Sequence, residues 1–269
     1  MYLEFFHLTE FPFSITPDPR YLYLSRQHRE AFHHVMYGIE QRKGFIQLTG
    51  EVGSGKTTLC RAVLGQLGSK TRTALILNPC VSAPELLRAI AHDFGLKAKG
   101  RDRLPYIEAL NAFLLERMRE GDNVALLIDE AQDLSPELME QVRLLSNLET
   151  DQAKLIQIVL VGQPELADRL DSPALRQLRQ RITVRYHLRT LAEEEVAAYI
   201  QHRLHMAGSD GSVLFDRKAL RTVFRYSKGI PRLINAACDA ALLAAYVAEV
   251  KTVDGRCMQR ALDHLEGPL

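Results

Sequence analysis

The sequence predicts an α/β fold in which a parallel sheet with helices on both faces is followed by a small all-helical domain. Five short, mainly apolar segments alternate with longer segments whose apolar residues recur at helical spacing. Strands that are buried on both faces are typical of parallel sheets, and their connections are usually helices. From Leu191 onward only the helical spacing remains. We therefore expect an α/β domain over residues 1–190 and a helical domain over residues 191–269.

The expected elements of the α/β domain follow in order along the chain. Residues 9–25 hold three prolines and four aromatic residues, which predicts an extended surface segment. Residues 29–42 have the spacing of an amphipathic helix. Ser82 with Glu85, and Ser135 with Pro136, are helix start signals. Strands are expected at 45–49, 73–78, 123–132, 155–166 and 182–188, and further helices at 59–67, 85–94, 105–120, 137–149 and 174–181.

The helical domain is predicted to contain about four helices. Their apolar residues repeat at helical spacing, and no segment between them reads as a strand. The expected helices cover residues 192–208, 216–229, 231–250 and 253–266.

A glycine-rich segment, GEVGSGKTT at residues 50–58, stands between the first strand and its helix. Glycines leave backbone N–H groups open to surround an anion, which the helix N-terminus also attracts. The spacing G-x-x-x-x-G-K-T is that of a P-loop, in which Lys56 would reach the β- and γ-phosphates and Thr57 would bind magnesium. A flexible turn with a solvated lysine is the alternative. We expect ATP and Mg²⁺ as cofactors, held by Gly50, Glu51, Val52, Gly53, Ser54, Gly55, Lys56, Thr57 and Thr58.

An acidic pair follows the apolar strand VALLI, about seventy residues after the P-loop. Ligands of open α/β sheets bind beyond the carboxyl ends of the strands, so Asp129 and Glu130 would share an edge with the P-loop. Asp129 would hold magnesium, and Glu130 would polarise the attacking water. Two solvated acids at a strand end are the alternative.

Gln163 and three arginines are further candidates. Gln163 follows the strand LIQIVLVG and would contact the γ-phosphate or position water, unless it is a simple polar strand end. Arg176, Arg179 and Arg181 precede the last strand. They form either a solvated helix face or an arginine finger for the ATP of a neighbouring subunit.

Arg232 lies at the start of a helix, after Gly229 and Pro231. A cation at a helix N-terminus opposes the helix dipole. This conflict indicates a function, such as contact with the γ-phosphate from the helical domain; a surface ion pair is the alternative.

Composition excludes few functions. Net charge is +1, so no overall basic field argues for nucleic acid. Four cysteines lack metal-type spacing and favour reduced thiols in a cytoplasmic protein. The N-terminus is not a signal peptide, and the longest apolar run, residues 240–248, is too short to span a bilayer.

Taken together, these motifs resemble those of AAA+ ATPases. The opening FFHLTEFPFSITPDPRYLYLS, with TGEVGSGKTTLCRA, ILNP, LLIDEAQ, VGQPEL, LRQRI and GIPRLIN, is similar to the ExeA/GspA family linked to type II secretion. Related ATPases serve MSHA-type pilus biogenesis and exosortase/PEP-CTERM systems. The resemblance covers nearly the whole chain.

The resemblance implies a role for each matching residue. Lys56 and Thr57 correspond to Walker A, and Asp129 and Glu130 to Walker B. Gln163 corresponds to sensor 1, and Arg232, in the helical lid, to sensor 2. Arg181 matches the arginine finger best, followed by Arg179 and Arg176.

The resemblance also implies a cellular role. It is Mg-dependent ATP hydrolysis by a homo-oligomer, such as a ring, that powers or regulates assembly of a bacterial secretion or pilus machine, including secretin assembly. The expected partner is an inner-membrane protein, and the expected location is the cytoplasm beside the inner membrane. Secretion-type members continue into a transmembrane helix and a peptidoglycan-binding domain, which these 269 residues do not contain. The sequence leaves open whether the chain is a cytoplasmic domain of a longer protein or a short relative.

Three rival functions are weighed against this one. A DNA-transposition ATPase of the TniB or IstB kind shares the core but needs a basic track for duplex DNA. A helicase, suggested by DEAQ, needs a second α/β motor domain. A nucleotide-binding scaffold without turnover would be expected to carry broken motifs. We expect no nucleic-acid partner, although local basic patches leave that possibility open.

Overall fold

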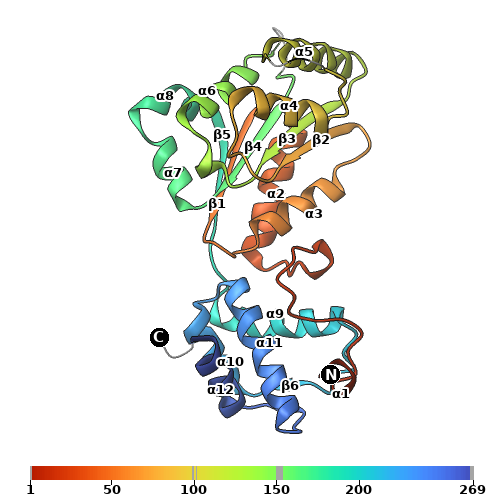
Figure 1. Ribbon diagram of the computed structural model, residues 1–269, viewed down its shortest axis with the longest axis vertical. Coiled ribbons are helices and arrows are strands. Elements are labelled where there is room, and N and C mark those ends of the chain that lie inside the picture. Colours follow the sequence, from red (N-terminus) through yellow and green to blue (C-terminus); the bar gives the residue numbers. More distant parts are fainter. Residues whose placement is uncertain (1, 99, 101, 150–153, 267–269) are drawn as a thin grey trace. The chain divides into compact units, whose positions relative to one another are not determined.

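The computed structural model describes residues 2–98, 100, 102–149 and 154–266, and these fold into two compact units (Figure 1). The sheet unit comprises the described parts of residues 29–50 and 59–188. The lid unit comprises the described parts of residues 1–28, 51–58 and 189–269. The lid unit thus combines the N-terminal segment, the P-loop and the C-terminal helices.

The sheet unit contains a five-stranded parallel sheet in the order β2-β3-β4-β1-β5. Every pairing within it is parallel. The predicted α/β fold with a parallel sheet is therefore confirmed. The strands are β1 (Phe45–Gly50), β2 (Thr71–Ile76), β3 (Asn123–Ile128), β4 (Gln157–Gly162) and β5 (Ile182–Leu188).

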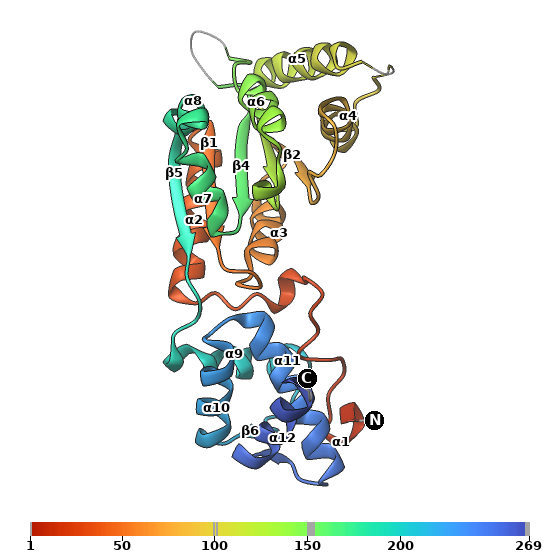
Figure 2. The ribbon, with the colours of Figure 1, turned by 60° about the vertical axis from the view of Figure 1, so that its left-hand side comes forward.

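Helices cover both faces of this sheet (Figures 1 and 2). Alternate residues of a strand point to opposite faces. Leu126 of β3 belongs to a core with α4, α5 and α6, and its neighbour Leu127 belongs to a second core with α2 and α3. Both side chains are fully buried, and burial of each such side chain stabilises the fold by about 1.5–3 kcal/mol. Because both faces of a strand are buried, the strands appear in the sequence as unbroken apolar runs. The helices are α2 (Arg26–Glu40), α3 (Lys56–Gln66), α4 (Ala83–Asp93), α5 (Leu104–Arg119), α6 (Pro136–Leu145), α7 (Pro164–Leu170) and α8 (Arg176–Arg181).

The helix start signals at Ser82 and Ser135 are confirmed, whereas the strand predicted over residues 123–132 was too long, because β3 ends at Ile128 and Ala131–Asp133 form a 3-10 helix. Glu85 accepts the Ser82 amide at 2.9 Å, and the Ser135 hydroxyl accepts the Leu138 amide at 3.2 Å. The prediction of one strand over residues 155–166 was too long, because β4 ends at Gly162 and Pro164 begins α7. Proline lacks the N–H that a strand needs but suits the first turn of a helix.

The lid unit is mainly helical. Its longer helices are α9 (Glu193–Met206), α10 (Arg217–Ser227), α11 (Pro231–Val247) and α12 (Gly255–Glu266), and a short helix α1 (Tyr2–Phe5) precedes them. The expectation of helices only was wrong at β6 (Leu214–Phe215) and β7 (Thr252–Val253), which pair in parallel. Strands of two residues are too short to leave a pattern in the sequence.

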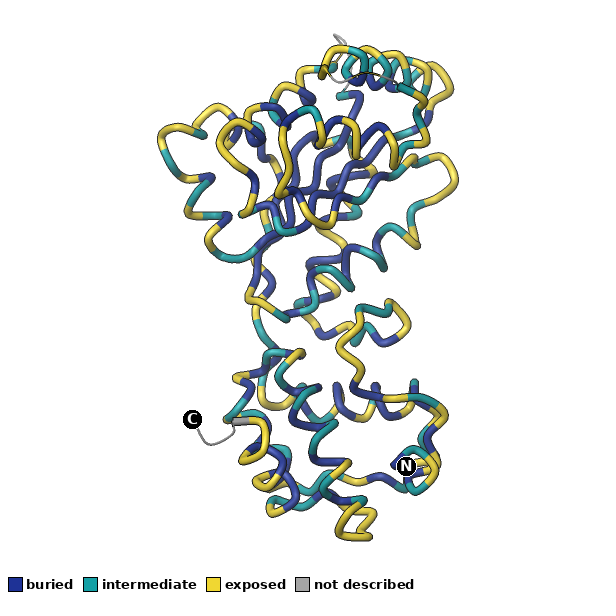
Figure 3. Tube along the Cα trace, in the orientation of Figure 1, coloured by how far each residue is buried: buried dark blue, intermediate teal, exposed yellow. Residues whose placement is uncertain are grey.

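The N-terminal segment packs against the C-terminal helices. Phe13 and Tyr21 are buried in the same core as α9 and α11, so the prediction of a surface segment was wrong for these aromatic residues. Buried and exposed stretches alternate along the helices of the lid unit (Figure 3). The buried Arg203 guanidinium of α9 donates to the carbonyl oxygens of Pro12 at 2.5 Å and Ser14 at 2.9 Å. It also lies 4.7 Å from the centre of the Tyr21 ring. A buried cation with these partners holds the segment in place. The functional domain boundary near residue 190 stays a prediction.

Candidate nucleotide-binding site

Three neighbouring strands deliver the candidate residues to one edge of the sheet. β3, β4 and β1 are adjacent and parallel, so their carboxyl ends lie at the same edge. The P-loop follows Gly50 of β1, the acidic pair follows Ile128 of β3, and Gln163 follows Gly162 of β4. This edge is the usual place for ligands in open parallel sheets.

The P-loop, within the lid unit, has the backbone of an anion-binding loop. Gly53 and Gly55 have φ angles of +78° and +99°, which favour glycine. α3 begins at Lys56, so the positive end of its dipole faces the loop. The Lys56 ammonium is largely buried and donates to the Glu51 carbonyl at 2.9 Å. A phosphate oxygen is a stronger partner for a cation than this neutral carbonyl, so the loop suits a polyphosphate.

A buried histidine that sequence reasoning missed supports the P-loop. His28 Nε2 lies 3.0 Å from the Ser54 carbonyl oxygen, and its Nδ1 lies 2.8 Å from Ser25 Oγ. Because a carbonyl only accepts, Nε2 carries the hydrogen, and a neutral ring accepts the Ser25 hydroxyl at Nδ1. Burial lowers the pKa of His28 below its ordinary value, which favours this neutral form. A lone histidine in a helix gives no sequence signal for such a contact.

The amino end of α11 also contacts the P-loop within the lid unit. The Arg232 amide donates to the Gly53 carbonyl at 3.2 Å, while its side chain is exposed. A Cβ atom added to Gly53 would lie 2.5 Å from the Arg232 Cβ, so this approach requires glycine. Gly229 has φ +78°, and a Cβ there would lie 2.0 Å from the Leu191 carbonyl oxygen. The G-x-P-R motif thus combines a close backbone approach with an arginine at the start of a helix.

The acidic pair lies at the end of β3 in a constrained conformation. Asp129 is buried, and its amide donates to the Ile76 carbonyl of the adjacent strand at 2.8 Å. Its carboxylate accepts the Glu130 amide at 2.9 Å. Glu130 has φ 49° and ψ 39°, a left-handed conformation that is rare outside glycine and frequent at functional sites.

Two glutamines hold the Glu130 carboxylate. Gln132 Nε2 donates to Glu130 Oε2 at 2.7 Å, and Gln163 Nε2 donates to the same oxygen at 3.3 Å. Gln132 Oε1 accepts the Gln163 amide at 3.0 Å. A Cβ on Gly162 would lie 2.7 Å from Gln132 Oε1, so glycine leaves room for this link. We name Glu130, Gln132 and Gln163 the carboxylate cluster; Gln132, in the DEAQ segment, was not among the predicted site residues.

The candidate finger arginines lie away from this edge. Arg181 directly precedes β5, whose first residue Ile182 pairs with Phe45, the first residue of β1. Arg181 therefore lies at the amino end of the strands, where its guanidinium donates to Ser146 Oγ at 2.8 Å. Arg179 pairs with Asp171 at 3.0 Å, and Arg176 is exposed. The sheet thus separates Arg181 from the edge that carries the acidic pair.

Other classes of site are not found in the described part of the chain. None of its helices has the length and hydropathy that crossing a lipid bilayer requires. All four cysteines are free thiols. The described histidine, cysteine and carboxylate side chains form no group of three that could hold a metal. Magnesium needs no such group, because it binds through one or two carboxylates together with substrate phosphates.

Comparison with known proteins identifies the enzyme class. Residues 39–170 match the family described as AAA domain. The chain is 50% identical over 247 residues to general secretion pathway protein A of Aeromonas hydrophila, and this match covers 91% of the chain but 45% of that protein. The chain therefore spans about half the length of the curated relative. The predicted AAA ATPase class and the resemblance to the GspA proteins are confirmed, and the transposition alternative is not favoured.

Solved structures share the fold. The Aeropyrum pernix ORC2 protein has a TM-score of 0.71 at 18% identity, covering 94% of this chain and 71% of that one. Cdc6p of Pyrobaculum aerophilum has a TM-score of 0.70 at 16% identity, with 94% and 70% covered. The RuvB branch migration motor of Thermotoga maritima has a TM-score of 0.60 at 17% identity, with 88% and 69% covered. At these identities the likeness concerns the fold alone.

Proposed function

We propose that this chain binds and hydrolyses Mg·ATP at the carboxyl edge of its sheet and works as an oligomeric ATPase in assembly of a bacterial envelope secretion machine. The proposal is carried by three neighbouring strands whose carboxyl ends lie at one edge of the sheet. A P-loop follows β1, an acidic pair follows β3, and a sensor glutamine follows β4. The 50% identity to general secretion pathway protein A supports the secretion context.

The binding residues have distinct tasks. The P-loop amides and the α3 amino end hold the phosphates, and Lys56 exchanges its Glu51 carbonyl for the β- and γ-phosphate oxygens. Thr57 and Asp129 supply oxygen ligands for magnesium, the type that this ion prefers. When held by these residues, magnesium would supply positive charge that offsets the negative charge of the phosphates.

The carboxylate cluster prepares the attacking water. Glu130 accepts hydrogen bonds from Gln132 and Gln163, which fix the position of its carboxylate for the transfer of a proton from water. Gln163, as sensor 1, is one residue from the β4 end and links the γ-phosphate to this carboxylate. Arg232, as sensor 2, responds to the nucleotide through the helix whose first turn contacts Gly53.

Arg181 acts on a neighbouring subunit. Its place at the amino end of the strands keeps it from the phosphates of its own chain. Its charge stabilises negative charge in the transition state of the next subunit, so full activity needs a homo-oligomer. The assembly works in the cytoplasm at the inner membrane, beside an inner-membrane partner protein.

The proposal is tested by replacing Glu130 with glutamine. The variant should bind Mg·ATP normally, while steady-state phosphate release falls by about a hundredfold or more because the base is lost. Glu137→Gln, an exposed acid in the first turn of α6, is the matched control and should be normal. Normal phosphate release by Glu130→Gln would show that the base is another residue.

A further inference from the structure

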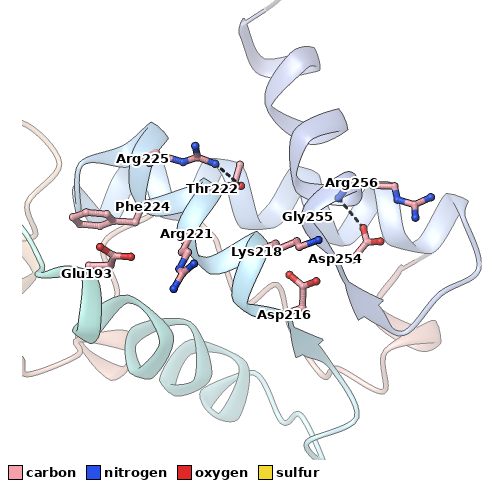
Figure 4. A pocket seen from close by; sticks show the side chains of 10 residues that line it. All are labelled: Glu193, Asp216, Lys218, Arg221, Thr222, Phe224, Arg225, Asp254, Gly255 and Arg256. Carbon is pink, nitrogen blue, oxygen red and sulfur yellow. Dashed lines mark hydrogen bonds between the residues drawn. The ribbon is translucent and has the colours of Figure 1, made fainter.

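A charged hollow in the lid unit contains none of the proposed nucleotide-binding residues. It has a volume of about 690 Å³ and runs along α10, between the start of α9 and the amino end of α12 (Figure 4). Lys218, Arg221 and Arg225 of α10 and Arg256 of α12 line it. Its size suits a few amino-acid side chains of a partner.

The four cations of the hollow are exposed and unpaired within the described chain. None has a carboxylate oxygen within 4.0 Å among the residues that the structure describes, whereas other arginines such as Arg143 form ion pairs with acids on their own helix. Lys218, Arg221 and Arg225 are three and four residues apart and so share one face of α10. Like charges four residues apart cost a few tenths of a kcal/mol in a helix. Arg225 donates to the Thr222 hydroxyl at 3.4 Å, which leaves the charge of its guanidinium without an ion pair.

Two acids that line the hollow have other roles. Asp216 accepts the Ala219 amide at 2.6 Å, and Asp254 accepts the Cys257 amide at 2.8 Å. Each carboxylate thus caps a helix whose amino end attracts negative charge. Glu193 is the remaining acid, so four cations and three acids line the hollow, and two of those acids are engaged at helix amino ends. The lining has a net formal charge of +1, and its cations are the side chains left available to a partner.

We propose that this hollow binds an acidic peptide segment of a protein partner. Guanidinium groups recognise carboxylates through paired hydrogen bonds, and Arg221, Arg225 and Arg256 supply three of them. Phe224 also lines the hollow and provides apolar surface for a side chain beside those carboxylates. A concave site that is lined by cations, an acid and an aromatic ring suits a peptide that contains both acidic and apolar residues. Duplex DNA needs a continuous track of cations along its phosphates, and a lipid surface is flat.

The test uses a labelled twelve-residue peptide of repeated Glu-Glu-Leu, with a Gln-Gln-Leu peptide of equal length as the uncharged control. Fluorescence anisotropy with the full chain should show saturable binding of the acidic peptide only. The double variant Arg221→Glu/Arg225→Glu should weaken this binding by about tenfold or more, since charge pairs across an interface contribute at that level. Lys70→Glu/Arg119→Glu changes two exposed cations of the sheet unit by the same charge and should bind normally.

Further arms of the experiment exclude the other partners. Circular dichroism must show that both double variants fold, and a photo-crosslinking version of the peptide should label residues near Phe224. Equal loss in both double variants would mean nonspecific attraction and would overturn the proposal. So would absence of saturable binding, labelling elsewhere, or tighter binding of a twenty-base-pair duplex or phosphatidylserine vesicles through Arg221 and Arg225. ATP is left out of every arm, so the result is independent of the proposed ATPase activity.

Discussion

The P-loop and the carboxylate cluster, two parts of one proposed site, are held in place by different means. Glu130 and Gln163 follow strands inside a five-stranded sheet, and the parallel pairing of β3 with β4 brings them to one another and to Gln132. The P-loop backbone instead accepts hydrogen bonds from His28 and Arg232, which belong to helices rather than to the sheet. One part is fixed by neighbouring strands, and the other by contacts from helices.

We expect substitutions in the two parts to affect turnover and nucleotide affinity differently. Changes at Glu130 and Gln132 of the carboxylate cluster should lower turnover and leave nucleotide affinity intact, because these two residues act on water. Changes in the supports of the P-loop should lower affinity and leave turnover at saturation intact, because they act on phosphate binding. The predictions below separate these effects, beginning with a residue that belongs to neither part.

The largest effect is expected for Arg181→Ala. Its charge serves a neighbouring subunit, so ATP turnover under assembling conditions should fall by about a thousandfold. The measurement is a mixing experiment with Lys56→Ala, which has a damaged P-loop and an intact Arg181. Each variant alone should be nearly inactive, and the mixture should regain part of the activity. Full activity of Arg181→Ala by itself would transfer the role to Arg179 or Arg176.

Lys56→Ala should weaken ATP binding by about a hundredfold, because a buried charge-assisted contact to phosphate is lost. Titration of a fluorescent ATP analogue gives the affinity of both proteins. Lys70→Ala, an exposed lysine outside the loop, should bind like the parent chain. Equal affinity of Lys56→Ala and the parent chain would contradict the P-loop assignment.

Gln132→Ala should reduce turnover by about tenfold through the loss of its hydrogen bonds to Glu130 and Gln163. ATP affinity should stay unchanged, whereas a structural defect of the whole unit would lower affinity as well. Steady-state kinetics measures turnover, and nucleotide titration measures affinity. Gln177→Ala, at an exposed position of α8, is the control. A loss of affinity equal to the loss of turnover would end the proposed separation of the two parts.

The smallest effect is expected for His28→Ala. Without the bond to the Ser54 carbonyl, ATP affinity should fall by about fivefold, as expected for one buried hydrogen bond, with turnover at saturation unchanged. His28→Gln retains a donor and should recover part of the affinity, and the exposed His33→Ala is the control on the same helix. If turnover at saturation falls while affinity stays normal, His28 supports catalysis rather than binding.

Much of the fold was predictable because strong local patterns specify it. Strands buried on both faces, such as β3 with Leu126 and Leu127 facing two cores, must be apolar throughout. Helix starts at Ser82 and Ser135 depend on side chains three residues apart. The N-terminal segment could not be placed in the same way. Its burial depends on Arg203, almost two hundred residues later, and no local pattern encodes such a distance.

The sequence by itself determined the apolar strands, the P-loop and the acidic pair, because each depends on residues that are close together in the chain. The tertiary structure alone decided which distant side chains support them. It brought His28 to the Ser54 carbonyl and the Arg232 amide to Gly53, and it joined Gln132 with Glu130 and Gln163. Such contacts form only when the strands and helices pack, since a hydrogen bond requires atoms within about 3 Å and its partners can lie anywhere in the sequence.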